Sequence, residues 1–467
     1  MNSVIMGGQY TKIILILWCC IYWIGCTPSA KEATNETAAD STSQVEPQAT
    51  SEAVSPAIPE RNALPPLPKV PGQKVHTGAE RLVSQASELL AGKRIGIVAN
   101  HTSRLPQGAH LVDTLLGLGI EIVAVFSPEH GFRGDADAGA KVASGKDERT
   151  GLPIISLYGK NRKPQQAQLE GIDVMLFDLQ DVGSRHYTYI STLTYVMEAC
   201  GEASIPVMVL DRPNPNGWYV DGPMMEAAFT SFIGMHTVPI VHGMTVGEYA
   251  RMILGEKWIT DPLPELEVVE AEGYRHEMKW EETGLEWIPP SPNLGTAYAA
   301  YLYPGLCWLE PTPVSVGRGT HDAFTLVGAP WLRFATEAAT ARTVEGTHRE
   351  LYGLTLIPNN FIPVSLPGKS THPKFQDKMC KGIKFEGVVS GRNLFLAGIT
   401  LMQQVYQDAE AAGKGSGFFY KGFEKWSGYG GFRQQITDGI PAEEIYDSWQ
   451  DEVTAYRSIR AKYLIYD

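Results

Sequence analysis

A cluster of ionisable side chains follows an apolar segment in the first half of the chain. Residues 126–139, FSPEHGFRGDADAG, place Glu129 beside His130, and Arg133, three glycines and two aspartates complete the stretch. A turn needs only the glycines. A carboxylic acid in such company is a common proton donor in acid–base catalysis. The sequence therefore makes Glu129 the first candidate for a catalytic residue.

Polar residues follow three other apolar segments in the same way. They are Asn100, His101 and Thr102 after 94–99, then Asp178, Gln180, Asp181, Arg185 and His186 after 172–177, then Asp211, Arg212, Asn214 and Asn216 after 205–210. Any one of them alone would be interpreted as a turn residue, and the proline-rich stretch around Asn214 also fits a plain turn. Their recurrence at four segment ends, with carboxylates and guanidinium groups together, indicates a site.

The elements that must position these residues alternate along the chain. Nearly continuous apolar strands are predicted at 94–100, 120–126, 152–159, 172–181 and 205–211, and amphipathic helices at 76–94, 108–119, 163–171 and 191–203. Such alternation predicts an α/β fold, a Rossmann-like, doubly wound parallel sheet covered on both faces. Ligands bind such sheets outside the carboxyl ends of the strands. The four groups of polar residues should therefore meet at one edge.

The pattern changes after about residue 230. A strand and a helix with the capping pair Thr245 and Glu248 occupy 237–258, a short strand follows at 266–271, and helices are predicted at 394–409 and 443–464. Between them we expect long loops rich in proline and tryptophan, one of which, SVGRGT, contains Arg318. We predict a catalytic domain at 76–232 and a smaller α+β domain at 233–467 that completes a cleft.

The first residues have the features of an export signal. Residues 1–26 contain an apolar run that ends at Gly25-Cys26, which predicts a signal peptide with a lipoprotein cleavage box. A soluble exported protein and an uncleaved anchor are the alternatives, and all three predict export, to the periplasm or to an outer-membrane-anchored state. Residues 27–75, dominated by Ala, Ser, Thr, Pro and Glu, predict a disordered tether.

Composition and missing motifs exclude several functions. A net charge of −13 argues against nucleic-acid binding. The chain has no GxGxxG after the first strand, no GxSxG and no Walker loop, so no nucleotide cofactor is predicted. Beyond the export segment only Cys200, Cys307 and Cys380 remain, without metal-ligand spacing. We expect three buried thiols, with one disulfide as the alternative, and no metal.

Several of these stretches also resemble a known family. The motifs ANHTSR, FSPEHGFRG, TGLPIISLYG, FDLQDVGSRHYTYISTL, LDRPNPNG, PIVHGMTVGEYARM, PPSPNL and SVGRGT are similar to those of the bacterial exo-β-N-acetylmuramidases, over residues 76–467. The resemblance implies an exo-acting glycoside hydrolase of cell-wall turnover that removes terminal N-acetylmuramic acid from the non-reducing ends of peptidoglycan fragments. It also implies a cleft between a Rossmann-like and a smaller domain, with Glu129 as the key residue.

Glycoside hydrolysis needs an acid and a second group. Partial burial at a strand end would favour the protonated form of Glu129, and Asp178 or Asp181 could be the second catalytic carboxylate unless the substrate's own amide attacks. His130 is expected to point away from Glu129, as neighbours in an extended segment do, and to have a positioning role.

The remaining polar candidates are assigned to the substrate. One of three arginines, Arg185, Arg212 or Arg318, should bind the lactyl carboxylate. His242 should contact sugar hydroxyls, unless it is a buried structural histidine. The other predicted substrate contacts are Asn100, His101, Arg133, Gln180, His186 and Asn214.

Two other classes of function stay open at this point. The chain could be a non-catalytic lipoprotein that binds sugars or muropeptides, which a turnover assay would distinguish. It could also be a metal-dependent hydrolase using His101, Glu129, His130 and Asp178, although no HExxH spacing supports a metal. Chelator sensitivity would distinguish that reading.

Overall fold

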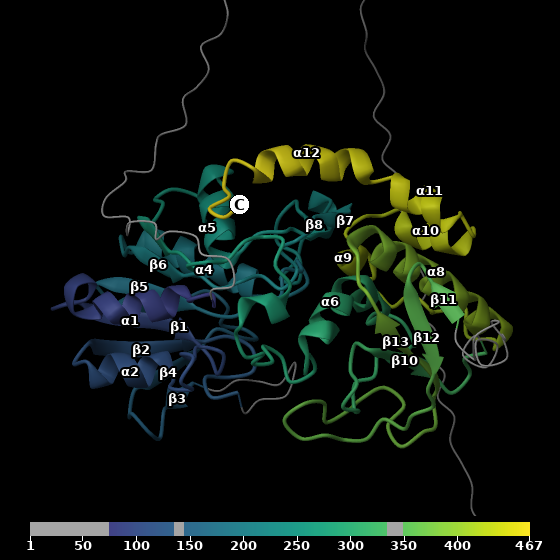
Figure 1. The fold of residues 1–467 in the computed structure, drawn as a ribbon, viewed down its shortest axis with the longest axis horizontal. Helices are drawn as coiled ribbons and strands as arrows, with labels where there is room; N and C mark the ends of the chain where they lie inside the picture. Colours follow the sequence, from purple (N-terminus) through teal and green to yellow (C-terminus); the bar gives the residue numbers. More distant parts are fainter. Residues whose placement is uncertain (1–73, 135–143, 334–348) are drawn as a thin grey trace, which may run out of the picture. The chain divides into compact units, whose positions relative to one another are not determined.

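The computed structural model describes residues 74–134, 144–333 and 349–467 (Figure 1). The predicted signal segment 1–26 and residues 27–73 of the predicted tether lie outside the described residues. The prediction that the tether extends to residue 75 is wrong at its last residue. Val75 is buried, and its backbone N–H donates to the carbonyl of Thr283 at 2.9 Å. Ordered packing therefore begins at or before Val75, because that apolar side chain has a core to enter.

A seven-stranded sheet forms the first half of the fold, in the order β3-β4-β2-β1-β5-β6-β9 (Figure 1). Its parallel strands are β1 (Arg94–Ala99), β2 (Glu121–Ser127), β4 (Pro153–Ser156), β5 (Val174–Asp178), β6 (Val207–Leu210) and β9 (Leu266–Val269). Only β3 (Gly145–Lys146) is antiparallel. The predicted α/β class is confirmed.

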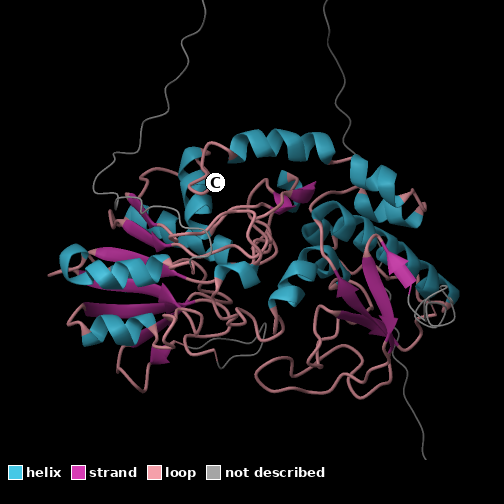
Figure 2. Ribbon diagram, in the orientation of Figure 1, coloured by secondary structure: helices cyan, strands magenta, loops and turns pink. Residues whose placement is uncertain are grey.

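Helices cover both faces of this sheet, as Figure 2 shows in cyan around magenta strands. The cluster on one face includes side chains of α1 (Gly78–Leu89) and α2 (Leu111–Gly117), and the cluster on the other includes α3 (Gln166–Leu169), α4 (Tyr189–Glu202) and α5 (Val246–Gly255). Capping boxes start α1 and α5, as their sequences predict. Burial on both faces explains why the central strands are apolar at nearly every position.

The sheet continues past residue 232, where the catalytic domain was predicted to end. Strand β9 pairs with β6 in parallel register, and α5 contacts both strands. Residues 246–269 therefore help to build the sheet that carries the first half of the fold.

The second half contains a four-stranded antiparallel sheet in the order β10-β13-β12-β11 and a cluster of helices (Figure 1). The strands are β10 (Leu326–Ala329), β11 (Arg349–Leu351), β12 (Leu354–Pro358) and β13 (Lys381–Gly387), and the hairpin β7 (Asp221–Met224)–β8 (Pro239–Val241) stands apart. The helices are α6 (Ala297–Leu306), α8 (Gly391–Ala411), α9 (Glu424–Ser427), α10 (Phe432–Thr437), α11 (Ala442–Asp447) and α12 (Gln450–Arg460), with short 3-10 turns at Ala227–Phe229, Trp280–Thr283 and Cys307–Leu309.

One predicted loop is a helix. Residues 301–306 were expected to begin a proline-containing loop, but they belong to α6, which Thr296 caps through its side chain. Pro304 has no N–H for the carbonyl of Ala300, and Asn216 Nδ2 donates to that carbonyl instead, at 2.9 Å. A residue far away in sequence thus satisfies the bond that proline removes. The helix expected at 443–464 is divided into α11 and α12.

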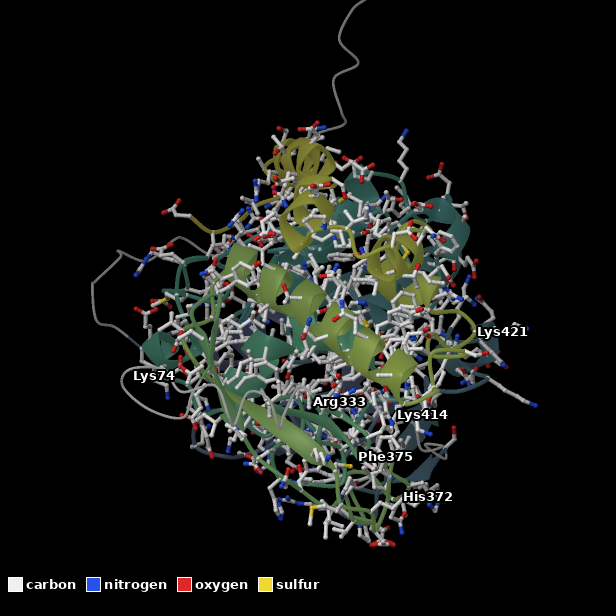
Figure 3. The ribbon with its side chains drawn as sticks, turned by 90° about the vertical axis from the view of Figure 1, so that its right-hand side faces the viewer. Lys74, Arg333, His372, Phe375, Lys414 and Lys421 are labelled. Atoms are coloured by element: carbon white, nitrogen blue, oxygen red, sulfur yellow. The ribbon has the colours of Figure 1, made fainter. Side chains whose placement is uncertain are left out.

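Figure 3 looks onto the second half, where α8 crosses the view and Lys414 lies just past its end. Helix α8 packs against α6, α10 and α11. Cys200, Cys307 and Cys380 are buried and free, as expected. Within the described ranges no helix is both long enough and apolar enough to span a bilayer.

Candidate active site

Glu129 lines a pocket at the carboxyl edge of the seven-stranded sheet. The residue lies two positions beyond β2, and its carboxyl is partly exposed. The other residues that line the pocket are His130, His186, Tyr187, Thr188, Tyr189, Ser291, Leu294, Tyr303, Arg318 and Phe324. They come from the loop after β2, the start of α4, the loop before α6, α6 itself and the loop before β10. Four predicted site residues therefore share one pocket: Glu129, His130, His186 and Arg318.

Two hydroxyl groups hold the Glu129 carboxylate. Tyr158, which follows β4, donates to Oε1 at 3.1 Å, and Thr188, which precedes α4, donates to Oε2 at 3.5 Å. Burial and the nearby carboxylate raise the pKa of the Tyr158 phenol, so it stays a donor at any ordinary pH. The carboxylate is thus held by hydroxyl groups from two separate segments, one after β4 and one before α4.

The backbone at His130 differs from the extended segment that the sequence predicts. His130 has a φ of 74° and is followed by Gly131 at 77°. This left-handed conformation costs a non-glycine residue about 1 kcal/mol. It also explains why His130 lines the same pocket as Glu129, where extended geometry would have pointed the two side chains apart. Such local strain is typical of functional turns.

Arg318 supplies the positive charge of the pocket. Its Nε donates to both carboxylate oxygens of Glu310, each at 3.1 Å, and its guanidinium lies 5.1 Å from the ring centre of Phe324. Within the described part of the chain, Nε is the only guanidinium nitrogen of Arg318 that has a protein partner. The two terminal nitrogens are therefore available for a ligand. The side chain is 28 % exposed.

His186 forms a wall of the pocket and is electrically neutral. Its Nε2 donates to the carbonyl of Trp426 at 2.7 Å, and its ring stacks on the Trp426 indole. Burial, reinforced by the charge of Arg185, lowers the pKa of His186 to about 3. This histidine joins the first half of the fold to the α9 region of the second half.

Several pocket residues escaped prediction from the sequence. They are Tyr187, Thr188, Tyr189, Ser291, Leu294, Tyr303 and Phe324. Tyr158 and Glu310, which hold Glu129 and Arg318 without lining the pocket, were not predicted either. A signal existed for the residues 187–189, which follow His186 directly.

Asn100 holds a residue of the pocket wall and does not line the pocket itself. Its Nδ2 donates to the Tyr189 hydroxyl at 2.7 Å, which in turn donates to the Pro290 carbonyl at 3.0 Å.

The structure does not bring Asp178 to Glu129. Asp178 is fully buried, and its carboxylate pairs with Arg212 through Nε at 2.6 Å and Nη2 at 3.0 Å. The pair is buried at the carboxyl edge of the sheet, and neither residue is among those that line the Glu129 pocket. The charge of each partner satisfies the other, so the predicted catalytic carboxylate is a structural counter-ion in this geometry.

Asp181 is also absent from the residues that line this pocket. Its Oδ1 accepts the backbone N–H of Gly183 at 2.8 Å, while no hydrogen-bond partner reaches Oδ2 among the described residues. Burial raises the pKa of Asp181 to about 7. The carboxyl group is sealed inside the loop after β5, which a strand-end position in sequence does not reveal.

Two of the arginines predicted to contact the substrate, Arg185 and Arg133, bind other protein groups instead. Arg185 is fully buried and donates to the carbonyls of Pro223, Val238 at 2.9 Å and Ser427 at 2.6 Å, and burial lowers its pKa to about 9. Arg133 pairs with Asp147 at 2.8 Å and with Asp113 at 3.3 Å. Of the three arginines predicted for a lactyl carboxylate, only Arg318 lines the Glu129 pocket.

The remaining predicted contacts are held by backbone groups. His101 Nε2 donates to the Pro289 carbonyl at 2.8 Å, and Asn214 Nδ2 donates to Met244 O at 2.8 Å. His242 is buried and accepts the Met244 N–H through Nδ1 at 3.2 Å, and burial lowers its pKa to about 3. Of the two alternatives for His242, a contact of sugar hydroxyls or a buried structural histidine, this geometry fits the second. Gln180 and Arg212 line a second pocket.

No group of three or more His, Cys, Asp or Glu side chains in the described ranges is arranged to hold a metal ion. The four residues considered for a metal, including Asp178 with its arginine partner, therefore do not form such a group in this structure.

Comparison with known proteins decides the family. The family model described as exo-beta-N-acetylmuramidase NamZ, N-terminal, matches residues 95–298, and its C-terminal counterpart matches residues 301–466. This chain belongs to the NamZ family. A curated relative, the peptidoglycan beta-N-acetylmuramidase NamZ of Bacillus subtilis (strain 168), is 38 % identical over 404 residues, which are 84 % of this chain and 92 % of the relative.

Two solved structures share the NamZ-family fold of this chain. Both are DUF1343 family proteins from Bacteroides fragilis NCTC 9343. The first is 35 % identical with a TM-score of 0.70 and covers 85 % of this chain and 99 % of its own. The second is 31 % identical with a TM-score of 0.73 and covers 84 % and 99 %. The two NamZ models meet between residues 298 and 301, within α6.

Proposed function

We propose that this chain is an exo-acting glycoside hydrolase that releases terminal N-acetylmuramic acid from the non-reducing ends of peptidoglycan fragments. Membership of the NamZ family supports this activity. The observation that carries it is that Glu129 and Arg318 line the same pocket. A carboxyl group there can protonate the leaving oxygen, and a guanidinium can bind the carboxylate that distinguishes a muramic sugar.

In this proposal the two sides of the pocket have separate roles. Glu129, aligned by Tyr158 and Thr188, donates a proton to the glycosidic oxygen. Arg318, held through Nε by Glu310, presents its terminal nitrogens to the lactyl carboxylate as a bidentate donor. Tyr187 and Tyr303 contribute the aromatic walls that exclude water from the sugar.

The second group of the reaction comes from the substrate in our proposal. Glu129 is the only carboxylate among the residues that line the described pocket, and Asp178 and Asp181 lie elsewhere. Some glycosidases use the substrate's own N-acetyl group as the nucleophile. The N-acetyl oxygen would attack the anomeric carbon while Glu129 protonates the leaving group, and water would then open the bicyclic intermediate with Glu129 as base.

The replacement Glu129→Gln tests the proton donor. It keeps the size of the side chain but removes the acid, so we expect kcat on a chromogenic β-N-acetylmuramide to fall about 100-fold or more. Glu121→Gln, an exposed carboxyl at the start of the same strand, is the matched control and should keep full activity. An undiminished rate for Glu129→Gln would remove Glu129 from the mechanism.

Stereochemistry tests the second group. A substrate-assisted reaction releases the sugar with its anomeric configuration retained, because two displacements occur at the same carbon. Proton NMR of the first product formed from a defined disaccharide should therefore show the β-anomer. Release of the α-anomer would show that water attacks directly and that the substrate amide is not the nucleophile.

We also propose that the protein is exported and anchored by a lipid on Cys26, in the periplasm or at the outer membrane. The apolar run that ends at Gly25-Cys26 and the polar stretch that follows it support this location. In cells fed a labelled fatty acid, the protein should carry the label, and Cys26→Ala should lose it while Cys20→Ala keeps it. Label on the Cys26→Ala protein would contradict the anchor.

A further inference from the structure

A second pocket lies at the carboxyl edge of the seven-stranded sheet. Its free space is about 1090 Å³ up to the open mouth, against about 420 Å³ for the Glu129 pocket. Thr102 and Arg104 enter it after β1, Gln180 after β5 and Arg212 after β6. The other wall is the segment 284–289 together with Trp280 and Lys74.

The strand order makes this position a natural ligand site. Strand β1 lies beside β5, and the chain leaves β1 toward β2 on one side but enters β5 and β6 on the other. The loops after β1 and β5 therefore diverge and leave a crevice between them. Open α/β sheets bind their ligands in the crevice at such a switch point.

The floor of this pocket presents two polar atoms that the protein leaves unsatisfied. Arg212 is 6 % exposed and Gln180 is 4 % exposed. Nε and Nη2 of Arg212 are engaged by Asp178 and the Arg104 carbonyl, and Nη1 has no partner among the described residues. Gln180 Nε2 donates to the carbonyls of Asp181 and Pro213, and Oε1 likewise accepts no hydrogen bond within the described ranges. Both residues are almost fully buried and line the pocket, so they offer it one donor and one acceptor that no described protein group occupies.

The walls of the pocket suit a saccharide. Trp280 and Trp287 meet edge to face at 5.0 Å, and Trp287 Nε1 donates to the Leu294 carbonyl at 2.9 Å, which fixes its ring. Aromatic faces of this kind pack against the apolar faces of sugar rings. Three charged lining residues are exposed: Lys74, labelled at the left of Figure 3, Arg104, and Glu286, which is the one acidic residue among those that line this pocket. The rim therefore favours an anionic ligand.

One loop separates the second pocket from the Glu129 pocket. Trp287 and Pro289 face the second pocket, whereas Ser291 and Leu294 face the first. The bond from His101 to the Pro289 carbonyl pins this loop to the sheet edge. A ligand longer than one sugar could therefore contact both pockets by crossing a single loop.

We infer that the second pocket binds a further sugar unit of the same peptidoglycan fragment, an N-acetylated, carboxylate-bearing saccharide. Its ring packs on Trp287, its carboxylate accepts from Arg212 Nη1, and a hydroxyl or amide group donates to Gln180 Oε1. The inference rests on the proposed function, because it assigns the substrate's outer part to the pocket that adjoins the Glu129 pocket.

Charge reversal at the rim tests this inference. Arg104→Glu changes an exposed side chain and should raise KM about tenfold for a tetrasaccharide fragment, with KM for the monosaccharide chromogenic substrate unchanged. Trp287→Ala should act in the same direction. Lys93→Glu makes the same charge change at the opposite end of β1 and is the matched control. Equal losses on both substrates, or no loss on the tetrasaccharide, would overturn the inference.

Failure of the proposed function gives a different result. If the wild-type protein cleaves neither substrate, calorimetric titration of the tetrasaccharide into wild type and Arg104→Glu still measures the pocket. Weaker binding to Arg104→Glu with unchanged binding to Lys93→Glu would support the pocket without the reaction. Equal binding to all three proteins, or no binding to wild type, would contradict it.

Discussion

Glu129 and Asp181 are both carboxyl groups near strand ends, yet their surroundings give them different uses. Glu129 opens on a pocket and receives hydrogen bonds from Tyr158 and Thr188. Asp181 is sealed, and only one of its oxygens has a partner among the described residues. At the scale of single residues, access to the pocket and not residue type separates a catalytic candidate from a structural one.

The hydroxyl of Tyr158 should matter for catalysis more than for folding. Tyr158→Phe removes the donor to Glu129 Oε1, and a hydrogen bond to a charged group is worth about 1.5–3 kcal/mol. We expect kcat/KM on the chromogenic substrate to fall about tenfold or more, with little change in the melting temperature. Tyr195→Phe, on α4 but outside the residues that line the pocket, is the control. Full activity of Tyr158→Phe would mean that Glu129 is aligned by other groups.

Asp181 should make stability depend on pH. Its pKa is about 7 in the folded protein because of burial, against about 4 in an unfolded chain. Between pH 4 and pH 7 the folded state holds a proton on Asp181 that the unfolded chain releases. The stability that this proton contributes is therefore fully present below pH 4 and is lost as the pH rises through 7. Asp181→Asn should therefore be more stable than wild type above pH 7, by up to about 4 kcal/mol.

Denaturant unfolding of both proteins from pH 4 to pH 8 measures this difference. The advantage of the variant should grow with pH and level off above 7. Asp451→Asn, an exposed residue of α12, should show no such trend. A difference that stays constant with pH would show that Asp181 is ionised throughout.

At the scale of elements, a half-buried lysine holds the loop that carries the pocket's positive charge. Lys374 Nζ donates to the carbonyls of Glu310 at 2.6 Å, Thr312 at 2.7 Å and Val314 at 2.9 Å. Glu310 in turn holds Nε of Arg318. The position of Arg318 therefore depends on a side chain that does not itself line the pocket.

Substrate affinity should follow the charge of Lys374. Burial lowers the pKa of Lys374 to about 8, although the Glu310 carboxylate opposes this and the Arg318 charge adds to it. A neutral amine has only two hydrogens for three carbonyls, so we expect KM to rise as pH increases above 8 while kcat changes less. Lys374→Met should show a KM about tenfold higher and constant with pH.

Steady-state kinetics from pH 6 to pH 9.5 measures both effects. Lys378→Met, an exposed neighbour, is the control and should keep the wild-type profile. A KM for Lys374→Met that follows the wild-type pH curve would show that another group titrates.

At the scale of the whole molecule, Arg185 links the two halves of the fold. Its guanidinium joins the carbonyls of Pro223 in β7, Val238 before β8 and Ser427 at the end of α9. The neighbouring His186 binds Trp426 O from the adjacent position. The pocket between Glu129 and Arg318 needs this link, because its two walls belong to different halves.

Removal of this guanidinium should destabilise the protein. Arg185→Met removes three hydrogen bonds at about 1 kcal/mol each, although the Val238 carbonyl keeps another donor, the Met225 N–H, so we expect about 3 kcal/mol less free energy of unfolding. Denaturant titration measures it, with Arg251→Met on α5 as the control. A loss below about 1 kcal/mol would show that other donors or water replace the guanidinium.

The sequence by itself determined the local elements and the place of the candidate acid. Strand and helix periodicity, the capping boxes at Thr77 and Thr245, and the position of Glu129 after β2 depend on neighbouring residues, so they are visible in a single sequence. The parallel sheet and the edge where ligands bind follow from the same alternation.

Only the tertiary structure decided which polar groups face the ligand. Asp178, Arg185 and Arg133 have the residue types of a site, yet each is paired inside the protein with partners 14 to 242 positions away. Helix α6 persists around Pro304 because Asn216 donates to the Ala300 carbonyl, which the proline leaves without its helical donor. Such pairings depend on distance in space, which residue order does not record, and burial then determines whether a charge serves the fold or the substrate.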